Sequence, residues 1–204
     1  LLDLPGWQAL QEELADHNFQ VIAVAVDEDV ETIRDAAHGI TYPILIDADH
    51  VVAELYAISN VPTVLMIDED DNIVQPNWSA YASDTFRELT GIDSEIQKDH
   101  IRAWAKDGTL RMSPEDAKGA VSDLSPEEEQ ARLFFRIATR LRNDGDADGA
   151  ERNFVTAIDL APHDWTVQRA AQPLRGINPF GEAFMELYTA FNEAGRPFHG
   201  VTGH

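Results

Sequence analysis

The spacing of apolar residues predicts alternating helices and strands over the first 74 residues. Trp7, Leu10 and Leu14 recur at helical spacing and predict a helix over about residues 1–14. Further helices are expected at residues 29–38 and at about 51–56, and strands at 19–26, 42–47, 63–67 and 73–74. This order predicts an α/β layer fold in which right-handed crossovers connect parallel strands.

The predicted strands at 19–26 and 63–67 read as apolar runs. Strands covered on both faces show this pattern, so we expect them to be buried. Pro62 has no backbone N–H to give to a ladder, which places it at the start of the strand 63–67. Asp47 and Asp49 are the expected N-cap residues of the helix that follows the second strand.

Three segments carry a resemblance to a known family. They are the strand that ends at Asp27, the run Tyr-Pro-Ile-Leu-Ile-Asp at 42–47, and Val61-Pro62-Thr63 leading into Val-Leu-Met-Ile-Asp. The chain resembles thioredoxin-fold proteins of the TlpA/ResA type, within the redoxin group that includes peroxiredoxins, over about residues 1–92. The resemblance implies an α/β, thioredoxin-like three-layer sandwich.

The same resemblance implies a site. In this family the peptide bond before the loop proline is cis, and the loop faces the substrate, so Val61, Pro62 and Thr63 are the expected substrate-facing residues. Trp7 lies on the first helix, where it is a candidate for a position near the active site, although packing in the core is the favoured role. The implied substrate is a protein or peptide thiol or disulfide, and no cofactor is expected.

The chain departs from the family because it contains no cysteine. The family's Cys-x-x-Cys motif lies at the start of the first helix, where the helix dipole lowers the pKa of the leading thiol. By family spacing this motif would precede Leu1. We therefore expect a thiol-disulfide oxidoreductase whose redox cysteines lie upstream of Leu1, so that the chain as given is not catalytically competent. The alternatives are a cysteine-free interaction module without catalysis and, less favoured, a peroxiredoxin-like enzyme with a single upstream cysteine.

Composition narrows the range of partners. The 204 residues include 37 acidic and 15 basic side chains, for a net charge of -22, which argues against nucleic-acid binding. No apolar run is long enough to span a bilayer. The seven histidines show no paired metal-ligand spacing, so no metal site is expected. The compartment is not fixed by the sequence, with a cytoplasmic location favoured, and neither the redox direction nor the oligomeric state is fixed.

The pattern changes after residue 92. Residues 93–124 read as a linker with a connecting helix, and residues 125–204 as an all-α region that begins with the capping box of Ser125 and Glu128. From Ala131 to Pro162 the spacing resembles one tetratricopeptide helix pair. A single pair cannot bury its apolar face alone, so we expect it to pack on the helix at 180–191. This region is the candidate for binding a protein partner or for self-association.

Overall fold

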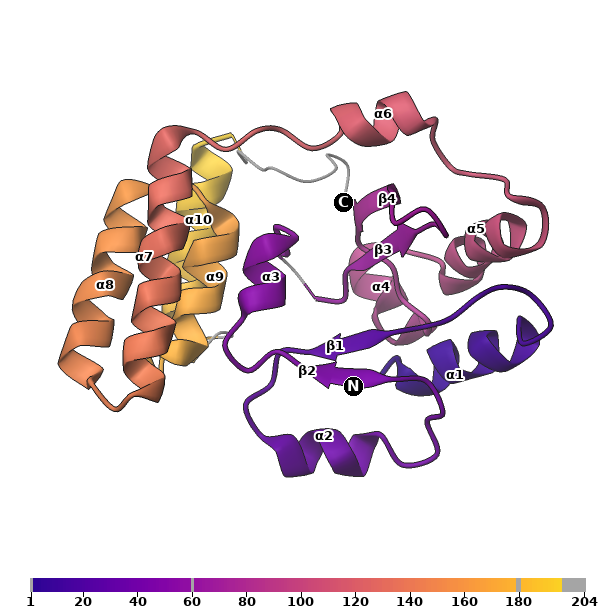
Figure 1. The fold of residues 1–204 in the computed structure, drawn as a ribbon, viewed down its shortest axis with the longest axis horizontal. Helices are drawn as coiled ribbons and strands as arrows, with labels where there is room; N and C mark the ends of the chain where they lie inside the picture. Colours follow the sequence, from indigo (N-terminus) through magenta and orange to yellow (C-terminus); the bar gives the residue numbers. More distant parts are fainter. Residues whose placement is uncertain (1, 60, 179–180, 196–204) are drawn as a thin grey trace. The chain divides into compact units, whose positions relative to one another are not determined.

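A computed structural model describes residues 2–59, 61–178 and 181–195 of the chain (Figure 1). Its contacts define two units. The α/β unit comprises residues 2–48 and 61–119, and the helical unit comprises the described residues of 49–60 and 120–203. Segment 49–59 therefore belongs to the helical unit, although the chain on both sides of it belongs to the α/β unit. The division into 1–92, 93–124 and 125–204 stays a prediction.

The α/β unit contains two small sheets. Its elements are α1 Leu4–Glu13, β1 Ala23–Ala25, α2 Val30–Ala36, β2 Ile44–Ile46, β3 Val64–Ile67, β4 Ile73–Trp78, the 3-10 turn Asp84–Phe86, α4 Arg87–Thr90, α5 Ser94–Asp107 and α6 Pro114–Gly119. Strand β1 pairs with β2 in parallel, and β3 pairs with β4 antiparallel. Within the described residues the strands form these two pairs and not one continuous sheet.

Strands β1, β2 and β3 are shorter and more exposed than the apolar runs predicted, whereas β4 extends to Trp78 and is largely buried. The first two strands span three residues each, and Val24 and Leu45, which lie opposite each other in the ladder, are both exposed. In β3 only Met66 is buried. The prediction of strands buried on both faces was therefore wrong. An apolar run shows that a strand can be covered on both faces, but burial also needs a neighbour on each face and edge.

The core of the α/β unit lies between α1, the β3–β4 pair and α5. Leu10 of α1 and Leu14, the C-cap residue of that helix, are buried together with Met66, Trp78 and Ile101. Leu10 and Leu14 are four residues apart, at the helical spacing that the sequence predicts. The first helix therefore directs its apolar face at the β3–β4 pair. On the same helix, Gln8 bonds both the backbone N–H and the hydroxyl of Thr41, which ties α1 to the segment that enters β2.

Tyr42 makes the stability of this unit sensitive to alkaline pH. Its ring is buried and its hydroxyl donates to the Leu4 carbonyl at 3.2 Å. Burial, with a contribution from the Asp3 charge, raises the pKa of Tyr42 from 10.0 to about 12. The unfolded chain therefore loses this proton first, so the stabilisation is complete below pH 10 and declines as the pH rises toward about 12. We expect the unfolding midpoint to fall over this range, and to fall less in Tyr42→Phe. An equal fall in both proteins would contradict this assignment.

Gly6 allows a close approach between α1 and the segment after β4. A Cβ atom added at Gly6 would lie 2.2 Å from the carbonyl oxygen of Ala82, and backbone cannot move aside as a flexible side chain can. We expect Gly6→Ala to destabilise the α/β unit by about 1–3 kcal/mol through overpacking. The control is Gly119→Ala, because a Cβ there meets no atom within 4 Å. Amide exchange of α1 in both variants measures the difference, and equal protection would argue against the close approach.

The helical unit is built around a helix hairpin. Its elements are α3 Val51–Leu55, α7 Pro126–Asn143, α8 Ala147–Leu160, α9 Trp165–Leu174 and α10 Glu182–Glu193. Phe135 of α7 and Phe154 of α8 meet edge to face, with ring centroids 5.8 Å apart. Small residues surround this contact, among them Ala138 and Ala157, and allow the two helices to pack closely. Helix α9 completes the cluster through Val167 and its neighbours.

Several local predictions for this unit can be compared with the structure. The capping box is confirmed, because Glu128 N–H donates to the Ser125 hydroxyl and the Glu128 carboxylate accepts from Ser125 N–H. Helix α9 includes Pro173 and ends at Leu174. Helix α10 packs on Trp165 of α9 through three aromatic rings, of which Phe191 is the closest at 4.5 Å between centroids. Phe180, the predicted start of that helix, lies outside the described residues.

Candidate functional site

The predicted substrate-facing loop lies between α3 and β3. Val61 is 52% exposed, while Pro62 and Thr63 are half-buried. The Val61–Pro62 peptide bond is cis. Strand β3 begins immediately after the loop and pairs along one edge with β4, its ladder starting at Val64 opposite Trp78. The loop therefore presents an exposed apolar side chain beside the first residue of a paired strand.

Trp7 is placed in the interior of the α/β unit. Its ring is half-buried and packs against the cluster formed by α1, the β3–β4 pair and α5. Its backbone N–H donates to the Asp3 carbonyl in the first turn of α1. These contacts are those of a core residue, and its position relative to an active site stays a prediction.

The loop offers contact surface but no nucleophile for thiol chemistry. The chain has no cysteine, and thiol-disulfide exchange requires a thiolate as the attacking group. Within the described residues no cluster of histidine and acidic side chains could hold a metal ion. The described helices also lack the length and hydropathy needed to cross a membrane. The described arrangement therefore cannot itself exchange a disulfide.

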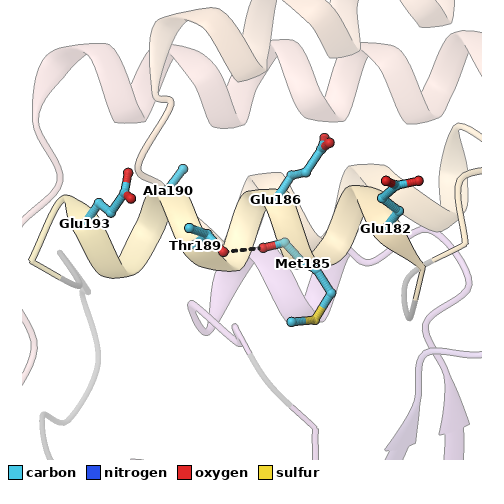
Figure 2. Close-up of a pocket in the computed structure, with 6 residues that line it drawn as sticks. All are labelled: Glu182, Met185, Glu186, Thr189, Ala190 and Glu193. Carbon is cyan, nitrogen blue, oxygen red and sulfur yellow. Dashed lines mark hydrogen bonds between the residues drawn. The ribbon is translucent and has the colours of Figure 1, made fainter.

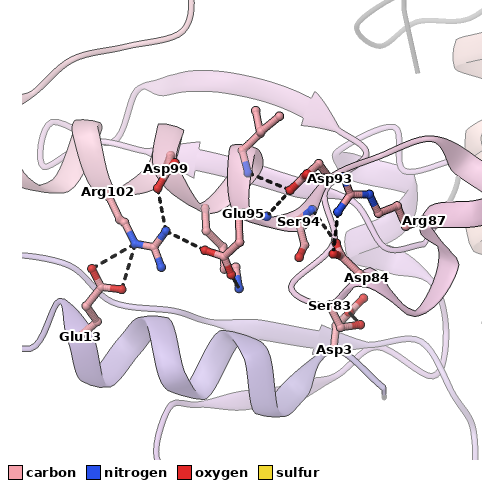
Figure 3. A network of polar contacts seen from close by, with 12 residues as sticks. Asp3, Glu13, Ser83, Asp84, Arg87, Asp93, Ser94, Glu95, Asp99 and Arg102 are labelled. Carbon is pink, nitrogen blue, oxygen red and sulfur yellow. Dashed lines mark hydrogen bonds and ion pairs between the residues drawn. The ribbon is translucent and has the colours of Figure 1, made fainter.

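A charged network on α5 was not foreseen from the sequence (Figure 3). Arg102 donates from Nε to Glu13 of α1 at 2.9 Å and from Nη1 to Asp99 and Glu95 of its own helix. Burial lowers the pKa of Arg102, but the hydrogen bonds to the three carboxylates outweigh it and raise that pKa. The hydrogen bond from Arg102 in turn lowers the pKa of Glu13. Every charge in this group is paired, so the network ties α5 to α1 and leaves no group free for acid–base chemistry.

The helical unit carries a shallow hollow on α10 (Figure 2). It has a volume of about 420 Å³ and is lined by Glu182, Met185, Glu186, Thr189, Ala190 and Glu193. The Thr189 hydroxyl donates its hydrogen bond to the Met185 carbonyl within the helix. Three exposed carboxylates on one helix face provide negative charge but no paired base and nucleophile. We assign no chemistry to this hollow.

Comparison with known families defines the class of the N-terminal part. Residues 2–75 match the family model described as AhpC/TSA family. This part of the chain is therefore a redoxin, thioredoxin-like domain, and it includes the loop at Val61, Pro62 and Thr63. No curated protein and no solved structure matches the chain.

Proposed function

We propose that the α/β unit is the substrate-holding part of a thiol-disulfide oxidoreductase similar to the TlpA/ResA type. In this proposal Val61, Pro62 and Thr63 face the substrate, and the redox thiols come from sequence outside these 204 residues. The match of residues 2–75 to the AhpC/TSA family carries the proposal, because proteins of the redoxin group share a fold that presents thiols.

The open edges of the two sheets support the same proposal. Within the described residues, β1 pairs only with β2, and β3 pairs only with β4. Exposed apolar side chains lie on these strands, namely Val24, Leu45, Ile46 and Ile67. Unpaired edges beside apolar faces are costly unless another strand covers them. A further strand that pairs there would bring a thiol-bearing segment next to the loop.

The proposed exchange has two steps. The leading thiolate attacks one sulfur of the substrate disulfide, which forms a mixed disulfide and releases the other substrate sulfur as a thiolate. The second thiol then attacks the mixed disulfide, so that the substrate leaves reduced and the enzyme keeps a disulfide. In both steps the residues of this chain bind the substrate. Val61 contacts the apolar side chains of the substrate, and the backbone of the loop holds the extended chain of the substrate.

A substitution in this loop tests this role. It is made in the protein in the form that the native source produces. Reduction of insulin by dithiothreitol reports the exchange. We expect Val61→Asp to raise KM about tenfold with little change in kcat, because it removes binding shared by the ground state and the transition state. Val121→Asp is the matched control, since Val121 is also an exposed valine in the α/β-to-helical connection. Equal KM values for the two variants would argue against the loop as the substrate contact.

A second candidate function is a binding module without catalysis. Two observations support it. The chain contains no cysteine, and segment 49–59 groups with the helical unit. A redoxin domain would instead pack the helix of this segment, α3, in its own layers. A native protein that contains no thiol and reduces no insulin would favour this candidate.

The helix pair α7–α8 is the proposed partner-binding part of the molecule. We infer a tetratricopeptide-like pair from the spacing between Ala131 and Pro162, and its buried alanines at 138, 150 and 157 support this reading. Helices α9 and α10 would then act as the neighbours that a single pair needs for stability. The partner in this proposal is a protein or a second copy of the chain, and the proposal involves neither nucleic acid nor a cofactor.

A further inference from the structure

The helical unit holds a group of four charged side chains from three of its elements, and three of the four are buried while Arg136 is 45% exposed. Glu54 lies on α3, Arg132 and Arg136 lie on α7, and Asp164 is the N-cap residue of α9. The side chains of Glu54, Arg132 and Asp164 are only 3%, 7% and 1% exposed. Charges at this depth are stable only when each is paired and hydrogen-bonded.

Helix α7 contacts both the side chain and the backbone of Glu54. Arg136 Nε donates to Glu54 Oε2 at 2.6 Å, and Arg132 Nη1 donates to the Glu54 carbonyl at 2.8 Å. That carbonyl lies in the last turn of α3, where it also accepts from the Ala57 N–H at 3.2 Å. The hydrogen bond to Glu54 also raises the pKa of Arg136. Arg136 therefore binds the carboxylate of Glu54, and Arg132 binds its backbone carbonyl at the end of α3.

A second contact fixes the direction of the bound segment. Asn143, at the C-terminal end of α7, donates to the Asp49 carboxylate at 2.9 Å. Asp49 precedes Glu54 in the chain, while Asn143 follows Arg132 and Arg136, so the segment runs antiparallel to α7. Segment 49–59 thus meets polar partners on one helix at its first residue, Asp49, and at Glu54 in its middle.

The arginine at the centre is held independently of this segment. Arg132 Nε donates to Asp164 Oδ2 at 3.0 Å. Asp164 in turn accepts from the backbone N–H groups of Thr166 and Val167, where it caps α9. Arg132 therefore has a partner on α9 that would remain if Glu54 moved away, although its Nη1 would then lose the Glu54 carbonyl. This is the arrangement of a preformed binding site.

We propose that α7 and α9 form a binding site for the end of a short acidic helix, that segment 49–59 occupies this site in cis, and that an acidic helix of a protein partner competes for it. The occupant seen here defines the ligand: a glutamate in the last turn of a helix, preceded five residues earlier by an acidic side chain that Asn143 reaches. The proposal does not depend on the thiol chemistry proposed above.

A labelled peptide of residues 47–59 tests the site by fluorescence anisotropy with the full 204-residue chain. In the wild-type chain the tethered segment competes at an effective concentration in the millimolar range, so we expect weak binding. Glu54→Arg brings a third guanidinium beside two arginines and should release the segment. We expect the peptide to bind this variant about tenfold or more tightly than wild type.

Three controls decide the outcome. A peptide with glutamine in place of Glu54 should bind about tenfold more weakly, because the charge-assisted hydrogen bond is lost. Adding Arg136→Met to the Glu54→Arg chain should abolish the gain, and adding Arg140→Met, which removes an exposed arginine of the same helix, should not. Equal binding to wild type and Glu54→Arg, or equal binding of the two peptides, would overturn the proposal.

A milder variant covers the case in which Glu54→Arg does not fold. In Glu54→Gln we expect amide exchange of segment 49–59 to become about tenfold faster while α7 to α9 keep their protection. Unchanged exchange in segment 49–59 would mean that Glu54 does not hold it, and would also overturn the proposal.

Discussion

Phe135→Ala is expected to lower the free energy of unfolding of the helical unit by about 3–5 kcal/mol. Phe135 is fully buried, and its ring meets Phe154 edge to face across the α7–α8 pair. Removing the ring takes away this aromatic contact and leaves a cavity bounded by helices that can close only in part. Amide exchange of α7 and α8 under native conditions measures the loss without assuming that the two units unfold together.

Leu133→Ala is the matched control on the same helix. Leu133 lies two residues away and is 57% exposed, so its truncation removes little buried surface. We expect a change within about 0.5 kcal/mol. Comparable losses in the two variants would show that α7 does not present the face described here to α8.

Arg132→Met is expected to cost about 3–5 kcal/mol, because it leaves the buried carboxylates of Glu54 and Asp164 without their shared partner. Methionine keeps much of the length and apolar surface of the arginine stem, so the loss reports the charge and its hydrogen bonds rather than packing. Urea unfolding followed by amide exchange of α7 and α9 provides the measurement.

Arg140→Met gives the comparison for a surface pair on the same helix. Arg140 is 78% exposed and pairs with Asp144 one turn away. Solvent-exposed pairs of this kind contribute at most about 1 kcal/mol, so this variant should remain close to wild type. If both arginine variants lose the same stability, the Glu54 group is not buried in solution as described.

Sequence reasoning succeeded where the deciding contacts are local. The capping box at Ser125 and Glu128 depends on residues three apart, and the structure forms both of its hydrogen bonds. The family match over residues 2–75 likewise follows from a continuous stretch of chain, which the resemblance had singled out. Alternation of helix and strand in this stretch was also visible from apolar spacing alone.

It failed where a residue's role depends on a distant partner. Asp49 was expected to cap α3, but His50 occupies the N-cap position and the Asp49 side chain bonds Asn143, 94 residues away. Glu54 and Arg132 are separated by 78 residues, and neither lies in a motif. A charged residue on a predicted helix is usually solvated, so no pattern in the sequence distinguishes this buried group from a surface pair.

The four predicted strands are present, but the burial expected of the apolar runs failed for a related reason. Val24 and Leu45 belong to apolar runs, yet they are exposed, because their burial depends on which element lies over that face and not on the run itself. The same exposure now supports the proposal that another strand completes the sheet.

The most direct test of the proposed function is to count alkylatable thiols by intact mass in the protein purified from its native source, before and after reduction. The oxidoreductase proposal predicts a pair of thiols that react after reduction, since the pair alternates between a dithiol and a disulfide during the exchange. A single thiol would instead favour a peroxidase of the redoxin group. A protein that takes up no alkylating reagent under either condition would contradict the proposal and leave the redoxin domain with a binding role.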